Sequence, residues 1–439
     1  MLLKFCGERP RSWEAEVSRA ERMTREGGVT RRFEESEWRQ RGIVCRRDFR
    51  CGRRWTSRLR LTVRRAAARL RAIRMTRESE LRARLQICAL RVVTCLTILA
   101  LCGFSLTNPA AAGLKAPAQV IIDTDPGTDD ALAILLALNS PEIEVRALTV
   151  VPGNVTGKQG LENALKIVSL AGRCDIPVAG GAQHPLFQKL ITAEFWHGAN
   201  GLANVELPAS KCKADTRWAP DLIIEMVHAA PHEITLVPVG PLTNIALAVE
   251  KDPSIVPLVK EVVIMGGSIT GGNVNASAEA NIYGDPEAAQ IVFQAGWPLT
   301  MVGSDVGERT LFGTKQVEEL SKTHGPENDF AVAVLKYLVA LSQKFGVDGT
   351  AMYDPLAVGA AIDRSVIQTQ PMHVDVETRG QFTRGETVAN RRNAIERNVP
   401  HEDRLWIESL DPVPPNVQVA VGSNAEKFAE LFISRIRGK

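Results

Sequence analysis

Residues 119–138 read QVIIDTDPGTDDALAILLAL: a short apolar run, an acidic loop and a longer apolar run. Within eight residues the loop carries four carboxylates, those of Asp123, Asp125, Asp129 and Asp130. Negative charges this close repel one another strongly unless a cation lies among them, and oxygen-rich sites suit a hard divalent metal. Pro126 and Gly127 supply a tight turn that folds the carboxylates inward. The alternative is a solvated acidic loop with an Asp helix cap, but a cap needs one Asp rather than four.

The main body, residues 117–439, alternates short β-branched runs with longer helix-like runs. The strand-like runs are Val120–Ile122, Val145–Val151, Ile234–Val239, Val262–Met265 and Leu299–Val302. The helix-like runs are Asp130–Leu138, Gly160–Ala171, Ala219–Ala229, Leu242–Glu250, Pro286–Ala295 and Phe330–Lys344. This alternation predicts an α/β fold, an open and mostly parallel sheet flanked by helices, in a single domain. Such sheets bind ligands at the carboxyl ends of their strands, where the polar motifs of this chain fall.

The charge of the chain is divided unevenly along its length. Residues 1–91 hold 26 Lys and Arg against 11 Asp and Glu, whereas the remaining residues hold 27 against 39. The main body is therefore acidic and gives no indication of nucleic-acid binding. We interpret residues 1–91 as a disordered segment or as sequence upstream of the true start, with Met75 an internal start. A basic arm for nucleic acid or an organelle address is the alternative.

Residues 92–112 have the pattern of a secretory signal peptide. Arginines precede an apolar run of 15 residues, Val92–Leu106, and a membrane span needs about 20. Ala110–Ala112 then offers an A-x-A cleavage site. We expect export, to a periplasm, with no stable membrane insertion after cleavage. If the run is not a cleaved signal, the protein is cytoplasmic or membrane-anchored.

Cysteine usage follows the same division. Six of the eight cysteines lie before residue 103, and only Cys174 and Cys212 lie in the main body. No C-x-x-C pair occurs, which argues against zinc and thioredoxin-like sites. Cys174 and Cys212 either form a disulfide in an oxidising compartment or remain two buried free thiols.

Seven motifs follow one another along the main body. They are DTDPGTDD (123–130), PGN (152–154), FWHGANGL (195–202), VPVGPLTNIA (237–246), MGG (265–267), GGNVNASAEANIYGDPEAA (271–289) and YDPLAV (353–358). In order, type and spacing they resemble the inosine-uridine preferring nucleoside hydrolases, from about residue 119 to about 434. The resemblance implies a Rossmann-like nucleoside hydrolase fold. It also implies calcium-dependent (Ca2+) hydrolysis of the N-glycosidic bond of ribonucleosides, which releases ribose and a purine or pyrimidine base.

Carried over residue by residue, the resemblance implies a calcium site and a ribose site. The calcium ligands would be the side chains of Asp125, Asp129, Asp130 and Asp354 and the main-chain carbonyl of Val239. The ribose would be bound by Asp130, Asn154, Met265, Asn273, Glu279 and Asn281. A sugar with three hydroxyls needs such carboxamide and carboxylate partners, because unpaired buried hydroxyls are costly. Asp123 is expected to support the metal loop from behind.

The resemblance also implies catalytic residues, although Tyr353 departs from the family pattern. Asp125 would act as general base on a calcium-bound water, which attacks an oxocarbenium-like sugar. Many pyrimidine-active members carry His immediately before the last metal Asp, but this chain has Tyr353 there. His197 is the other candidate acid for the leaving base. Tyr353 and Ala280, which stands where an aromatic residue is common, leave the base preference open.

Three other interpretations remain open. A haloacid-dehalogenase-like phosphatase shares the pattern of Asp123 and Asp125 after a strand, but it expects Thr or Val where Gly127 stands. An exported nucleoside-binding protein would keep the pocket without turnover. A hydrolase of another N-riboside, such as nicotinamide riboside, would keep the chemistry as well. From the resemblance we also expect a homo-oligomer, a dimer or tetramer.

Overall fold

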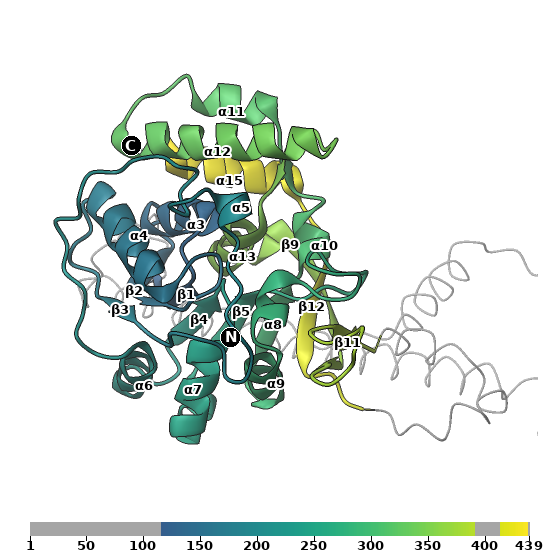
Figure 1. Cartoon of the computed structure of the whole chain (residues 1–439). Coiled ribbons are helices and arrows are strands. Elements are labelled where there is room, and N and C mark those ends of the chain that lie inside the picture. Colours follow the sequence, from purple (N-terminus) through teal and green to yellow (C-terminus); the bar gives the residue numbers. More distant parts are fainter. Residues whose placement is uncertain (1–115, 391–412, 438–439) are drawn as a thin grey trace, which may run out of the picture. The chain divides into compact units, whose positions relative to one another are not determined.

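The computed structural model describes residues 116–390 and 413–437 of the chain (Figure 1). These residues belong to one of two compact units of the chain, Ala112–Lys439. The Arg-rich segment 1–91 and the signal-like segment 92–112 lie outside the described residues. In the part that is described, no helix is both long and apolar enough to cross a membrane.

An eight-stranded sheet lies at the centre of this unit, in the order β3-β2-β1-β4-β5-β6-β12-β9 (Figure 1). The strands are β1 (Ala118–Thr124), β2 (Ile143–Val150), β3 (Val178–Gly180), β4 (Ile234–Pro238), β5 (Glu261–Met265), β6 (Leu299–Val302), β9 (Ile367–Met372) and β12 (Val417–Ser423). All neighbouring strands are parallel except β12 and β9. The mostly parallel sheet is confirmed, and the antiparallel edge strand β9 was not predicted.

Helices cover both faces because the strands alternate their apolar side chains. In β1, Val120 and Ile122 pack on one face and Ile121 on the other. The first face is covered by α3 (Thr128–Leu138), α4 (Gly157–Leu170), α12 (Pro326–Lys344), α13 (Tyr353–Ile362) and α15 (Ala425–Ile436). The second is covered by α6 (Ala219–Ala229), α7 (Thr243–Lys251) and α9 (Pro286–Gln294). In Figure 1, α12 and α15 lie above the sheet, and α6, α7 and α9 lie below it.

Shorter elements connect these layers. They are α5 (Glu194–His197), α8 (Ala280–Gly284), α10 (Ser304–Gly307), α11 (Thr314–Leu320), η1 (Pro253–Leu258), η2 (Arg364–Val366) and two antiparallel pairs, β7 (Leu311–Phe312) with β8 (Thr350–Ala351) and β10 (Val374–Val376) with β11 (Thr387–Ala389). All six helix-like runs are helices, with ends that differ from the prediction by a few residues. The YDPLAV motif begins α13, which was not predicted as a helix, because its residues are almost all buried and give no amphipathic period.

A disulfide joins Cys174 to Cys212, with 5.0 Å between their Cα atoms. It ties the end of α4 to the segment that precedes α6. Cys174 is exposed and Cys212 is half-buried. Of the two alternatives, the disulfide is therefore the one formed, and the alternative of two buried free thiols is wrong.

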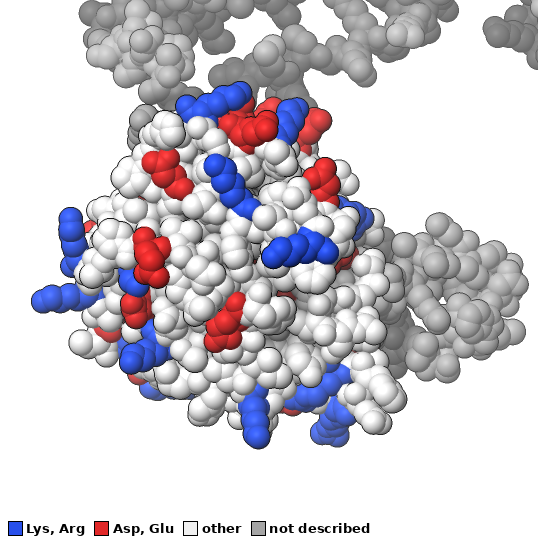
Figure 2. Space-filling model, turned by 45° about the horizontal axis from the view of Figure 1, so that its top comes forward, with Lys and Arg blue, Asp and Glu red and all other residues white. Residues whose placement is uncertain are grey.

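Elsewhere on the surface, basic and acidic side chains are interspersed over the face shown in Figure 2.

Three phenylalanines hold α15 to the rest of the first face. Phe312 of β7 stacks edge-on against Phe432 at 5.2 Å between ring centroids, and Phe428 lies 6.0 Å from Phe312. All three side chains are at most 1% exposed. This cluster joins the last helix to the segment that follows β6.

We expect Phe432→Ala to lower the free energy of unfolding by about 3–5 kcal/mol, because it removes a buried ring and leaves a cavity. Urea unfolding of the full chain, followed by tryptophan fluorescence, measures the change. Phe382→Ala is the matched control: that ring is 79% exposed, and its loss should change stability by less than about 0.5 kcal/mol. Equal effects of the two substitutions would contradict the packing of α15.

Candidate active site

The acidic motif lies where the sheet edge and two helices meet. β1 ends at Thr124 and α3 begins at Thr128, so the loop between them is only Asp125–Gly127. Asp129 and Asp130 lie in the first turn of α3, and Asp354 lies in the first turn of α13. Helix N-termini favour negative charge, so both helices are suited to carry these carboxylates.

Asp129, Asp130 and Asp354 form a cluster that can hold a metal ion. Each offers an oxygen atom, and these atoms lie within 4.8 Å of one another. Asp125 lies beside them, and Asp125 Oδ1 and Asp129 Oδ1 are buried with no hydrogen-bond partner among the described residues. Buried acceptors without a donor are rare in folded proteins, and a cation would satisfy them. The structure thus brings together the four predicted metal-binding carboxylates.

Burial and mutual repulsion disfavour the ionised forms of these groups in the protein alone. Burial, and then the charges of Asp129, Asp130 and Asp125, raise the pKa of Asp354 well above its ordinary value. Burial followed by the charge of Asp130 does the same to the pKa of Asp125, and burial raises the pKa of Asp129 to about 6. A positive ion among the carboxylates would reverse this effect, since it favours the charged form.

Hydrogen bonds fix the two carboxylates that face each other across the loop. Asp130 accepts from the Thr124 hydroxyl at 2.5 Å, from the Gly127 amide at 3.0 Å and from Asn154 Nδ2 at 2.9 Å. The Asn154 amide N–H donates to Asp125 Oδ2 at 2.7 Å. Asn154, a predicted ribose residue, therefore holds both carboxylates in place. The supporting role of Thr124 was not predicted, although it lies inside the acidic motif.

Two glycines leave room for the Asp125 carboxylate. A Cβ atom on Gly153 would lie 2.1 Å from Asp125 Oδ2, and one on Gly240 would lie 2.6 Å from Oδ1. Both distances are far below van der Waals contact, so only glycine fits. These glycines belong to the PGN and VPVGPLTNIA motifs. Room for the Asp125 carboxylate is therefore one reason why both motifs contain glycine.

Asp123 lies behind the acidic loop, as expected. Its Oδ1 accepts from the Thr149 hydroxyl at 2.6 Å and from Asn244 Nδ2 at 2.8 Å. Asn244 Oδ1 accepts from the Ala182 amide at 2.9 Å. Burial raises the pKa of Asp123 to about 7. This network connects the ends of β1, β2 and β3 to the start of α7.

The predicted ribose residues of β5 and α8 are buried and linked to one another. Glu279 caps α8, accepting from the amides of Gly267 and Asn281 at 2.9 Å each. Asn281 Nδ2 donates to the carbonyls of Val239 at 2.9 Å and Met265 at 3.1 Å. The carbonyl predicted as a metal ligand is therefore in contact with a predicted ribose residue. Burial raises the pKa of Glu279 to about 7.

Asn273, in contrast, is exposed in the loop before α8. Its Oδ1 accepts from the Ala280 amide at 3.0 Å, which makes it a turn-forming residue as well as a ribose candidate. Its side chain also hydrogen-bonds Tyr353, which connects this loop to the start of α13.

The two candidate acids differ in their surroundings. The Thr128 amide donates to His197 Nδ1 at 3.2 Å, and the Thr128 hydroxyl lies 2.7 Å from the same atom. An Nδ1 that accepts a hydrogen bond places the proton of the neutral ring on Nε2. Burial lowers the pKa of His197 to about 4, and burial raises the pKa of the Tyr353 phenol above its ordinary value. Neither group is tuned to give up a proton near neutral pH.

Tyr353 lines a cavity of about 320 Å3 that opens beside the acidic cluster. Asp129 also lines it, together with Trp196, Glu308, Leu311, Leu338, Ser342, Phe345, Val347, Gly349, Thr350 and Ala351. His197 is not among the lining residues. Glu308 and Phe345 belong to no motif, and no sequence signal identified them.

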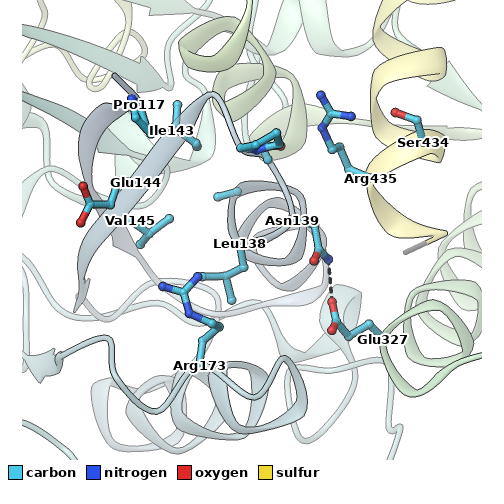
Figure 3. Close-up of a pocket in the computed structure, with 13 residues that line it drawn as sticks. Pro117, Leu138, Asn139, Ile143, Glu144, Val145, Arg173, Glu327, Ser434 and Arg435 are labelled. Atoms are coloured by element: carbon cyan, nitrogen blue, oxygen red, sulfur yellow. Dashed lines mark hydrogen bonds between the residues drawn. The ribbon is translucent and has the colours of Figure 1, made fainter. Parts of the chain in front are cut away.

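Another cavity, of about 630 Å3, lies at the opposite end of the strands (Figure 3). Pro117, before β1, and Ile143, at the start of β2, line it, so it faces the amino ends of the strands. Its charged groups are paired: Glu327 accepts from Asn139 at 2.6 Å, and Arg435 forms an ion pair with Glu142 at 2.5 Å. The chemistry of the acidic cluster has no counterpart there.

Fold and site together place an acidic cluster that can hold a metal ion at the carboxyl edge of a parallel sheet. The family model of the inosine-uridine preferring nucleoside hydrolases matches residues 120–430. The chain belongs to this family, and it is therefore an N-glycosyl hydrolase of ribonucleosides. Membership excludes the phosphatase alternative.

Individual relatives agree with this assignment. The chain is 43% identical to the inosine-uridine preferring nucleoside hydrolase of Crithidia fasciculata, over 73% of this chain and 98% of that protein. It is 36% identical to the pyrimidine-specific ribonucleoside hydrolase RihA of Photobacterium profundum, over 72% of this chain and 98% of that protein.

Solved structures give the same result. A plant nucleoside hydrolase (PpNRh1) matches with a TM-score of 0.67 and 38% identity, over 74% of this chain and 100% of that one. A purine-preferring ribonucleoside hydrolase from Gardnerella vaginalis matches with a TM-score of 0.66 and 36% identity, over 73% of this chain and 98% of that one.

We expect Gly153→Ala to lower kcat for nucleoside hydrolysis about 100-fold, because a shift of roughly 1 Å in a reacting group can cost that much. The added methyl group would overlap Asp125 Oδ2 and displace the carboxylate. Ribose release measures the rate. Gly180→Ala is the matched control at the end of β3, where the nearest atom to a Cβ lies at 3.4 Å. A folded Gly153→Ala protein with normal kcat would show that the position of Asp125 does not matter.

Proposed function

We propose that the chain hydrolyses purine or pyrimidine ribonucleosides with a bound calcium ion, through a metal-activated water and an oxocarbenium-like transition state. One observation carries the proposal: α3 and α13 bring Asp129, Asp130 and Asp354 within 4.8 Å of one another. The donor set contains oxygen only, and oxygen donors without His or Cys favour a hard cation such as calcium.

Five groups would hold the ion: the carboxylates of Asp125, Asp129, Asp130 and Asp354 and the carbonyl of Val239. The carbonyl fits, because the next residue, Gly240, lies against Asp125 Oδ1 and because this oxygen has a second lone pair beyond the one that Asn281 uses. When bound, calcium lowers the pKa of a coordinated water and positions it for attack.

Asp125 would take the proton from the attacking water. Its Oδ2 is held by the Asn154 amide, while its Oδ1 has no hydrogen-bond partner among the described residues. An oxygen of an oriented carboxylate that faces the metal keeps a second lone pair, which can accept the proton of the water. Gly153 and Gly240 allow this carboxylate to sit against the backbone without steric overlap.

The ribose would bind between Asp130, Asn154, Glu279, Asn281 and the exposed Asn273, with Met265 lining the sugar. Asn281 uses its Nδ2 for Val239 and Met265. The oxygen of the same amide is then the atom left for a sugar hydroxyl. Buried groups that are already oriented need no rearrangement when the sugar strains toward the transition state.

The base would occupy the cavity that Tyr353 lines. Tyr353 could donate a hydrogen bond to the departing base from the cavity wall. His197 would act from behind the cluster, where it orients Thr128, rather than as the acid. Relatives are named for inosine and uridine, for pyrimidines and for purines, and the proposal for this chain covers both classes of base.

We also propose that the protein is exported, with residues 92–112 as its signal and residues 117–439 as one nucleoside hydrolase domain. The disulfide between Cys174 and Cys212 supports an oxidising compartment such as a periplasm. A dimer or tetramer remains the expectation for the oligomeric state.

Calcium removal tests the function. We expect EGTA to lower ribose release from inosine and uridine at least about 100-fold in the full-length protein, and added calcium to restore it. The melting temperature should also fall when the metal is removed, because the carboxylates then repel one another. Full activity in protein shown by elemental analysis to be metal-free would exclude calcium. Tight nucleoside binding without ribose release would favour a nucleoside-binding protein instead.

Asp125→Asn tests the general base. The amide keeps an oxygen for the metal but cannot accept the proton, so we expect kcat to fall by about 10²–10⁴ with a smaller change in KM. Asp375→Asn, on the exposed side of β10, is the control and should leave kcat unchanged. A normal kcat in calcium-loaded Asp125→Asn would assign proton abstraction to another group.

A further inference from the structure

A buried asparagine that belongs to none of the seven motifs lies behind the acidic loop. Asn163 is part of α4, which lies beside α3 in Figure 1, and its side chain is 1% exposed. Its Nδ2 donates to the carbonyl of Pro126 at 3.0 Å and to the carbonyl of Asn200 at 2.9 Å. Pro126 belongs to the acidic loop and Asn200 to the FWHGANGL motif, so one amide group joins two segments that carry predicted site residues.

The orientation of this amide is fixed from its other side. Gln159, one turn earlier in α4, donates from Nε2 to Asn163 Oδ1 at 2.9 Å. Backbone carbonyls only accept hydrogen bonds, so the atom of Asn163 that faces them has to be Nδ2. Both N–H groups and the oxygen of the amide are therefore used, as a buried amide requires.

The contact with Pro126 continues to a predicted metal ligand. The peptide bond between Pro126 and Gly127 is planar and trans, so its carbonyl and its N–H point in opposite directions. The carbonyl accepts from Asn163, and the N–H donates to Asp130 Oδ2 at 3.0 Å. Asn163 therefore fixes the plane of the peptide whose other edge holds the Asp130 carboxylate. From Gln159 to Asp130 all donors point the same way, and hydrogen bonds in such a chain strengthen one another.

The FWHGANGL segment packs directly against Asn163. Gly201 has a φ of +77°, and a Cβ atom there would lie 2.9 Å from Asn163 Nδ2. Glycine is required on both counts, the small space and the left-handed backbone. Asn200 orders the same turn, because its Oδ1 accepts from the amides of Leu202 at 2.8 Å and Asn204 at 3.0 Å. The carbonyl that Asn163 reaches thus belongs to a well-defined turn.

Two other contacts hold this segment to the acidic site. The Thr128 amide donates to His197 Nδ1 at 3.2 Å, and the Ala193 amide donates to the Asn154 carbonyl at 2.9 Å. Both contacts run directly between the segment and the site. Asn163 differs from them, because it belongs to a helix that packs on the first face of the sheet and can set both segments relative to the core.

We propose that Asn163 is a positioning residue for the hydrolytic site. Through the Pro126–Gly127 peptide it sets the orientation of Asp130. Through the Asn200 carbonyl it fixes the segment that carries His197. The inference rests on the proposed function, in which Asp130 binds both the calcium ion and the ribose. Asn163 touches neither, so its loss should weaken calcium binding and slow hydrolysis without changing the reaction.

Asn163→Leu in the full-length protein tests the proposal. Leucine has a similar size but no donor, so the carbonyls of Pro126 and Asn200 lose their partner. We expect the Kd for calcium, measured by isothermal titration calorimetry on EGTA-treated protein, to rise about tenfold. At saturating calcium we expect kcat for ribose release from inosine to fall about tenfold, with a smaller change in KM.

Asn328→Leu is the matched control. Asn328 is 2% exposed, and its Nδ2 donates to the carbonyls of Leu320 at 3.0 Å and Thr323 at 2.6 Å. It makes the same kind of contact in the first turn of α12, whose opposite end borders the cavity beside the acidic cluster. We expect a comparable loss of stability in urea, but an unchanged Kd for calcium and an unchanged kcat.

Gln159→Glu changes the orientation of the amide while Asn163 itself stays in place. A carboxylate only accepts hydrogen bonds, so the Asn163 amide has to turn its Nδ2 away from the two carbonyls. We expect the Kd for calcium to rise about threefold, although the added negative charge alone would lower it. Lys158→Gln changes the net charge by the same amount at the neighbouring exposed position, and it should not weaken calcium binding.

Hydrogen exchange of the metal-free protein measures the coupling of the two segments without calcium or substrate. In Asn163→Leu, the peptides that cover residues 124–131 and 193–204 should both exchange faster than in the unsubstituted protein. Asn328→Leu should instead raise exchange in residues 320–328 alone.

The outcomes separate this inference from the proposed function. An unchanged Kd for calcium and kcat in both Asn163→Leu and Gln159→Glu would overturn the positioning role. Equal effects of Asn163→Leu and Asn328→Leu would overturn it too, because the cause would then be general destabilisation. If Asn163→Leu does not fold, Gln159→Glu against Lys158→Gln decides. Absence of both calcium binding and ribose release in the unsubstituted protein would overturn the proposed function, even where hydrogen exchange still showed the coupling of the two segments.

Discussion

The active site depends on one electrostatic constraint: several carboxylates are held together where water cannot separate them. Asp129, Asp130 and Asp354 come from the first turns of two helices that pack against each other, α3 and α13. Their mutual repulsion disfavours the ionised cluster, and Asp125 Oδ1 and Asp129 Oδ1 have no hydrogen-bond donor among the described residues to offset it. The two helix dipoles reduce the repulsion only in part. In the proposed function, a cation bound by the cluster would offset the rest.

The sheet makes this arrangement possible because it is parallel. β1, β2, β4 and β5 all end at the same edge, so loops far apart in sequence meet there. The backbone then approaches the carboxylates so closely that Gly153 and Gly240 cannot carry a side chain. Asn154 and Asn281 use backbone and side-chain contacts to fix the same edge. Residues predicted for the metal and for the sugar are therefore hydrogen-bonded to one another at this edge.

Much of this was predictable from sequence, for physical reasons. The order of apolar run, acidic loop and apolar run in residues 119–138 predicts a strand, a site and a helix. β1 confirms the strand and α3 confirms the helix. Two signals were weaker. The YDPLAV motif gave Asp354 but not its helix, since α13 is buried all round. The antiparallel pairing of β9 with β12 depends on contacts between distant segments, and no local pattern encodes it. Glu279 was predicted as a ribose-binding residue. Its role as the N-cap of α8 was not predicted, because it depends on backbone geometry that appears only in the fold.

The residues that sequence reasoning missed, Glu308 and Phe345, line the cavity beside the acidic cluster. Metal and sugar ligands must match one fixed chemistry, so they occur in dense motifs with fixed spacing. Part of the cavity is instead lined by single positions on separate elements, such as Glu308 and Phe345. Such positions can change without disturbing the cluster, which is what a family with different base preferences requires. The same division explains the candidate acids: His197 is tied to Thr128 and hence to the metal loop, whereas Tyr353 belongs to the cavity. In the proposed function, help for the leaving base would therefore come from the cavity side of the site, where Tyr353 lies.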